Sequence, residues 1–131
     1  MILNIFKWLT PKVSYDRFSV SSATLENIRR EWQMIDINIK GKQPSQLRQA
    51  LISADKTLDN ALRDCVKGES MAERLKNAQS KFDRYMYNKI WEAHKVRNNL
   101  VHESGYEPPH HMLTNAIQDL RQALATLGVK V

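Results

Sequence analysis

Residues 25–39 read LENIRREWQMIDINI, and the spacing of their apolar side chains predicts an amphipathic helix. The apolar residues recur at alternating intervals of three and four, so they form one stripe on a helix with about 3.6 residues per turn. The helix is expected to end near Gly41 and Pro44, because glycine and proline commonly follow the last helical turn. The residues of the stripe are Leu25, Ile28, Trp32, Ile35 and Ile39.

The same helical pattern continues to the C-terminus. The predicted helices span 47–65, 70–78, 83–104 and 111–127. Ser70 followed by Glu73 forms a capping box at the start of the third helix, and a glycine follows the ends of the other three. No stretch alternates with the period of two that is typical of strands. Short connections between amphipathic helices predict an all-α fold, an antiparallel bundle of four to five helices.

The composition is that of one globular domain. The chain has 131 residues, 42% apolar and 26% charged, and is long enough to bury a core without disulfides. Its one cysteine, Cys65, excludes an internal disulfide and a cysteine-based zinc site, and its place on an apolar stripe predicts a buried small hydrophobe. A reducing, intracellular setting fits this composition. We assign 21–131 to the helical domain and 1–20 to a hydrophobic arm and linker.

The N-terminal stretch reads MILNIFKWLTPK, and its apolar run, Ile2 to Leu9, stops before Pro11. Crossing a bilayer takes about 20 apolar residues, so the run is too short to do so. One interpretation is an arm that packs on the domain. Another is an anchor in a membrane interface, where Trp8 and the neighbouring lysines suit the headgroup layer, and a third is the remnant of a longer anchor. We expect a cytoplasmic protein, with peripheral attachment to the inner membrane face if the anchor interpretation holds.

The chain is basic, with 20 Lys and Arg against 14 Asp and Glu and a formal net charge of +6. The stretch 70–97 holds seven basic and three acidic side chains, so +4 of that charge lies there. Such an excess suits a polyanionic partner such as RNA, DNA or an anionic membrane. The alternative is that it serves only to keep the protein soluble. Arg84, Lys89 and Lys95 are candidate contacts to a nucleic-acid substrate.

Residues 91–103 read WEAHKVRNNLVHE and place polar side chains where the helix would be expected to repeat apolar ones. His94, Asn98 and His102 follow at intervals of four, so they line one face, with Arg97 on the adjacent arc. Burying them unpaired would cost on the order of several kcal/mol, so they need partners or a ligand. His94 and His102 lie about 12 Å apart along the axis, too far to share a metal ion.

These residue types suit phosphate chemistry. The planar fork of an arginine holds two phosphate oxygens, and its fixed charge stabilises a dianionic transition state. An imidazole exchanges protons near neutral pH, and both the helix C-terminus and Glu103 favour the imidazolium form of His102. Asn98 can orient an imidazole one turn away, and His94 is a further candidate substrate contact. Metal-independent cleavage of RNA by its own 2′-hydroxyl requires such groups.

The hexapeptide RNNLVH at 97–102 resembles the signature of the HEPN superfamily, an arginine and a polar residue followed by three residues of any kind and a histidine. The resemblance implies a small helical bundle that often dimerises, with the two motifs facing each other across the interface. It implies a metal-independent endoribonuclease without cofactors, in which Arg97 and His102 are catalytic and Asn98 supports them. RNA, a second copy of the chain and, in toxin–antitoxin or antiphage systems, an antitoxin would be the partners.

Three other interpretations stay open. Many HEPN members lack activity and act as binding or assembly modules, which here would include attachment to a membrane surface through Ile2–Leu9. In the second interpretation, the arginine and histidine of the motif have a purely structural role. They would hydrogen-bond to each other or pair with acids such as Glu92 and Glu103. The third interpretation is a basic DNA-binding bundle, whose affinity for DNA would fall steeply as the salt concentration rises.

Overall fold

The computed structural model describes residues 19–131, and within that range it contains helices and no strand. This confirms the predicted all-α bundle of four to five helices. Among these residues no helix is both long and apolar enough to cross a membrane. The arm or anchor proposed for Ile2–Leu9 lies outside the described residues. The helices are α2 (Ser22–Gly41), α3 (Pro44–Cys65), α4 (Met71–Asn77), α5 (Arg84–His102) and α6 (His110–Thr126), with a short 3₁₀ helix, η1 (Gln79–Lys81), before α5.

Polar side chains cap the starts of α2, α4 and α5. Ser21 caps α2 by accepting the N–H of Thr24 at 3.2 Å, and Asp83 caps α5 by accepting the N–H of Met86 at 2.7 Å. Each cap satisfies a backbone donor that the first turn of a helix leaves unpaired. The predicted helix at 83–104 is therefore observed with its cap at 83, and it ends at His102.

The start of α4 differs in one detail from the predicted capping box. Ser70 accepts the N–H of Glu73 at 3.1 Å, as predicted. The Glu73 carboxylate, however, accepts the N–H of Glu69 at 3.2 Å, one residue before the cap. The chain enters this turn at Gly68, where a Cβ atom would lie 2.7 Å from Cγ of Arg74 and 2.9 Å from its backbone nitrogen. Only a glycine lets the backbone pass so close to α4.

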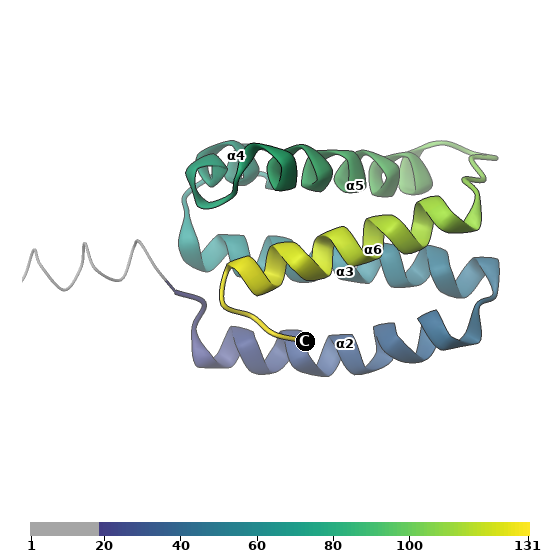
Figure 1. The fold of residues 1–131 in the computed structure, drawn as a ribbon, viewed down its shortest axis with the longest axis horizontal. Coiled ribbons are helices and arrows are strands. Elements are labelled where there is room, and N and C mark those ends of the chain that lie inside the picture. The colour runs from purple at the N-terminus through teal and green to yellow at the C-terminus, as the bar shows by residue number, and fades with distance from the viewer. Residues whose placement is uncertain (1–18) are drawn as a thin grey trace, which may run out of the picture.

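The helices are arranged around α3. Figure 1 shows α3 and α6 side by side in the middle of the bundle, with α2 on one side and α5 on the other. Helix α3 packs against α2, α4, α5 and α6, which makes it the central element of the fold. Helices α3 and α5 run in opposite directions, so the middle of α3 faces the middle of α5 (Figure 1).

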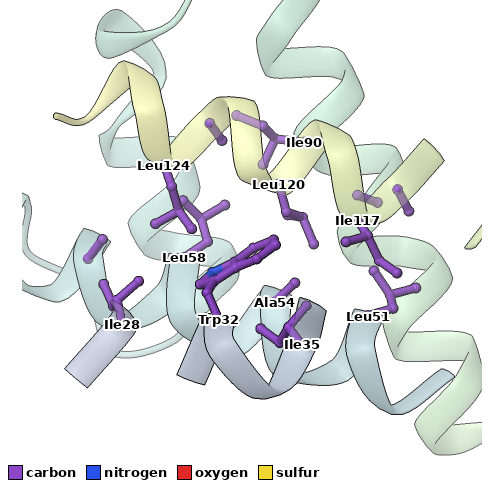
Figure 2. Close-up of a cluster of buried hydrophobic side chains, with 14 of the residues drawn as sticks. Ile28, Trp32, Ile35, Leu51, Ala54, Leu58, Ile90, Ile117, Leu120 and Leu124 are labelled. Carbon is purple, nitrogen blue, oxygen red and sulfur yellow. The ribbon is translucent and has the colours of Figure 1, made fainter. Parts of the chain in front are cut away.

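The core is built around Trp32 of α2, which is 2% exposed and lies among side chains of α3 and α6 (Figure 2). Its indole N–H donates to Oγ1 of Thr57 at 3.0 Å, and the Thr57 hydroxyl donates to the Ala54 carbonyl at 2.7 Å. The buried polar atoms of this pair are thus satisfied within the core. The guanidinium of Arg121 lies 4.4 Å from the centroid of the Trp32 ring and covers it on the side of α6.

Cys65 is buried at the end of α3, as its place on the apolar stripe predicts. Burial raises the pKa of its thiol, because the charged thiolate would lose hydration. The residue therefore acts as a small apolar side chain of the core.

Truncation of the core at Leu120 should show how much α6 depends on it. Leu120 is 0% exposed, so we expect Leu120→Ala to lower the free energy of unfolding by about 2–5 kcal/mol, through lost burial and the cavity left behind. Met34 is 58% exposed on α2, and Met34→Ala should change the same quantity by less than about 0.5 kcal/mol. Urea unfolding followed by circular dichroism measures both. Equal losses for the two variants would contradict this packing.

Candidate functional site

Helix α5 turns both apolar and polar side chains towards α3. Ile90 and Ala93 are 0% and 2% exposed and pack into the core. The next residues on this side, His94 and Arg97, reach a carboxylate of α3 instead. Val96 and Leu100 still pack against the core, so α5 places polar side chains beside apolar ones over this part of its length.

That carboxylate belongs to Asp55, which is 1% exposed. Nδ1 of His94 lies 3.0 Å from its Oδ2 and 3.2 Å from its Oδ1. Nε of Arg97 lies 3.6 Å from the same Oδ2, within ion-pair range but beyond an ordinary hydrogen bond. A buried carboxylate needs a cationic or hydrogen-bonding partner, and both residues of α5 supply one. We refer to Asp55, His94, Arg97 and Asn98 as the polar cluster.

The guanidinium of Arg97 is positioned by neighbouring side chains but stays partly exposed to solvent. Its Nη1 donates to Oδ1 of Asn98 at 2.9 Å, so the adjacent residue of the motif anchors one of its nitrogens. Its Nε is buried without a hydrogen-bond acceptor, and the side chain as a whole is 31% exposed. The group thus keeps donors that the cluster does not use.

Arg74, by contrast with Arg97, has its guanidinium fully paired. Nε and Nη2 of Arg74 donate to the two oxygens of Asp59 at 2.7 and 3.0 Å, and its Nη1 donates to the Gly68 carbonyl at 2.8 Å. The hydrogen bond to Asp59 raises the pKa of Arg74. This bidentate pair fastens α4 to α3 and leaves only 8% of the Arg74 side chain exposed. The pair formed by Arg97 and Asp55 has neither the geometry nor the burial of that structural pair.

Aromatic rings support His94 from its own helix. The ring of Trp91 meets the imidazole edge to face with centroids 6.0 Å apart, and Tyr87 meets Trp91 in the same way at 6.3 Å. These contacts and the two oxygens of Asp55 fix the plane of the imidazole.

His102 lies apart from the polar cluster. It is exposed at the last position of α5, and no hydrogen bond or ion pair joins its side chain to another residue in 19–131. It follows Arg97 by five positions, which corresponds to about 140° around the helix and about 7.5 Å along its axis. The two residues of the predicted catalytic pair thus leave α5 in different directions, and among the described residues no hydrogen bond joins their side chains; their catalytic role stays a prediction.

The predicted basic substrate contacts are also dispersed. Arg84 is exposed at the start of α5, about 20 Å along the axis from Arg97. Nζ of Lys89 lies 4.9 Å from the centroid of the Tyr85 ring, and its pKa is raised by the Tyr85 hydroxyl and then by the charge of Asp119. Their assignment to RNA binding stays a prediction.

Lys95 has an acidic neighbour on its own helix. Its Nζ lies 3.6 Å from Glu92, and both side chains are more than half exposed. The acids expected to pair with Arg97 included Glu92, whereas the acid that contacts Arg97 is Asp55. A role for Lys95 in RNA binding also stays a prediction.

A groove of about 270 Å³ lies between α5 and α6, and none of its lining residues belongs to the polar cluster. Burial within it raises the pKa of Asp119. Glu92 and Asp119 give it an acidic lining, which does not suit a phosphate. The polar cluster is thus the better candidate for a phosphate site. Among residues 19–131, no three His, Cys, Asp or Glu side chains are grouped so that they could hold a metal ion.

Asp55 is not among the residues predicted from the sequence, although its position carries a signal. It follows Leu51 by four residues and precedes Leu58 by three, so it is a carboxylate in the middle of an apolar stripe. A buried acid of this kind demands a partner from another helix. The partners, His94 and Arg97, are predicted from α5 for the same reason.

No family model, curated protein or solved structure matches the chain. The resemblance to the HEPN superfamily rests on the six residues at 97–102 and on the helical pattern around them, and it stays a prediction.

Removal of the Asp55 carboxylate should unbalance the polar cluster. We expect Asp55→Ala to lower the free energy of unfolding by about 3–5 kcal/mol, because it leaves Arg97 and His94 without the acid they share. Glu92→Ala removes an exposed acid that pairs with Lys95, and should cost less than about 1 kcal/mol. Urea unfolding of the two variants measures the difference, and a cost below 1 kcal/mol for both would contradict the buried pairing.

Proposed function

We propose that the protein is a metal-independent endoribonuclease of the HEPN type, with its site on α5. The proposal rests on the orientation and the exposure of the Arg97 guanidinium. This guanidinium is oriented by Asp55 and Asn98, yet the side chain is 31% exposed, and its Nη2 has no hydrogen bond to another described residue. An arginine held in this way is suited to an incoming anion, whereas Arg74 is occupied by Asp59.

The chemistry would be attack of the RNA 2′-hydroxyl on the adjacent phosphorus. Arg97 would stabilise the charge that develops on the phosphorane, and a histidine would accept the hydroxyl proton. The reaction needs no metal in this scheme. The products would carry a 2′,3′-cyclic phosphate and a 5′-hydroxyl, as the resemblance implies. The basic stretch at 70–97, which includes Arg84, Lys89 and Lys95, would attract the RNA.

A second copy of the chain would complete this site. Within one copy, Arg97 and His102 lie about 140° apart around α5, so they do not face the same phosphate. If two copies met along α5, His102 of one would be able to approach Arg97 of the other. This supports the homodimer that the resemblance implies. A place in a toxin–antitoxin or defence system, with an antitoxin as partner, follows from the same resemblance.

The alternative is a binding or assembly module without activity. The hydrogen bonds between His94 and the buried Asp55 favour it, because they also stabilise the packing of α5 on α3. Attachment to a membrane surface would then depend on Ile2–Leu9, outside the described residues. We propose a cytoplasmic location in either case.

Cleavage of a mixed RNA pool in excess EDTA tests the nuclease. The wild type should cleave it, and Arg97→Ala and His102→Ala should each lower the rate by at least about 100-fold, because they remove the cation and a proton-transfer group. His110→Ala changes an exposed histidine of α6 and should leave the rate unchanged. Circular dichroism would verify that all variants fold. Loss of cleavage on chelation, or equal cleavage by wild type and His102→Ala, would overturn this mechanism.

A further inference from the structure

His94 combines burial with one unpaired ring nitrogen. Its side chain is 9% exposed, and Nδ1 faces both oxygens of Asp55. Nε2, on the opposite edge of the ring, has no hydrogen bond to another described residue. This nitrogen is not a buried atom, so it reaches solvent. A histidine that served only the core would be expected to have both nitrogens paired.

We propose that His94, oriented by Asp55, is a second functional histidine, and that its Nε2 contacts the same RNA phosphate as Arg97. This inference rests on the proposed function for the identity of its ligand. Arg97 follows His94 by three positions, about 60° around α5 and about 4.5 Å along it, so the two side chains are neighbours. His102 lies about 12 Å further along the axis from His94. Within one chain, the imidazole beside the guanidinium is therefore that of His94.

The buried carboxylate fixes the tautomer that this role needs. An ionised Asp55 accepts a hydrogen bond from Nδ1–H, which leaves the lone pair of the imidazole on Nε2. The same carboxylate stabilises the imidazolium that forms when Nε2 takes up a proton. Asp55 is thus a positioning residue, and it acts on the substrate only through His94 and Arg97.

The proposed step is balanced without a metal or a cofactor. Nε2 of His94 takes the proton of the 2′-hydroxyl while the 2′-oxygen bonds to phosphorus and the bond from phosphorus to the 5′-oxygen breaks. The 5′-oxygen takes a proton from the imidazolium of His102 of a second copy, and His94 then passes its proton to water, from which His102 regains one. Arg97 neutralises the additional negative charge on the phosphate oxygens during the exchange.

Nitrogen-15 NMR of the histidine rings tests the contact independently of cleavage. The free protein should show the Nδ1–H tautomer for His94, and Asp55→Asn should change that signature because an amide can also donate to Nδ1. Added uridine 3′-monophosphate should shift the His94 signals and leave those of the exposed His110 unmoved. Arg97→Gln should weaken this binding by at least about 10-fold, because it removes the cation.

Cleavage assays provide the second arm. In an active protein, His94→Gln should lower the rate of RNA cleavage by at least about 100-fold, and Asp55→Asn should do so through His94. His110→Gln is the matched control, and cooperative urea unfolding verifies that each variant is folded. If Asp55→Asn fails to fold, His94→Gln still tests the inference, because it leaves Asp55 in place.

The outcomes separate the two proposals. If the nucleotide shifts His94 but the wild type does not cleave RNA, the phosphate contact is supported and the nuclease proposal fails. If the wild type cleaves RNA while His94→Gln is equally active, the inference is overturned and the nuclease stands. Unmoved His94 signals at saturating nucleotide also overturn the inference.

Discussion

The burial of one carboxylate determines how α5 sits on the bundle. Asp55 is 1% exposed on the central helix, and an unpaired charge in that place would be strongly destabilising. Only a helix that presents hydrogen-bond donors and a cation at the same level as Asp55 can pack there. Helix α5 does so with His94 and Arg97, and this requirement fixes both its rotation and its position along α3. The packing of Ile90 and Ala93 into the core follows from the same rotation.

Two acids of α3 illustrate two uses of an ion pair. Asp55 and Asp59 lie one turn apart, and each meets an arginine from another helix. Asp59 gives both oxygens to Arg74, which closes the contact and ties α4 to the bundle. Asp55 gives both oxygens to His94, so Arg97 stays near the charge without being fully bonded to it. The first arrangement is sufficient for a structural role, whereas the second leaves donors available to a ligand.

Local patterns were enough to predict the helices. The apolar stripe at 25–39 gives α2, and the cap at Ser70 gives the start of α4, because both depend on residues close together in the sequence. The partner of Asp55 lies 39 residues further along the chain, and its identity depends on the register between α3 and α5. Periodicity within one helix contains no information about that register. The polar residues of α5 could therefore be predicted as a group, but the acid that organises them could not.

The spacing of the motif limits what a single α5 can do. An arginine and a histidine five residues apart diverge by about 140° on any regular helix, whatever the rest of the sequence. Convergence on one phosphate then requires either the same helix of a second copy or another proton acceptor close to the arginine. Helix α3 decides which face of α5 is available, because Asp55 holds His94 and Arg97 together and leaves His102 in solvent. The chemistry that we propose for the site would thus depend on a residue outside the motif as much as on the motif itself.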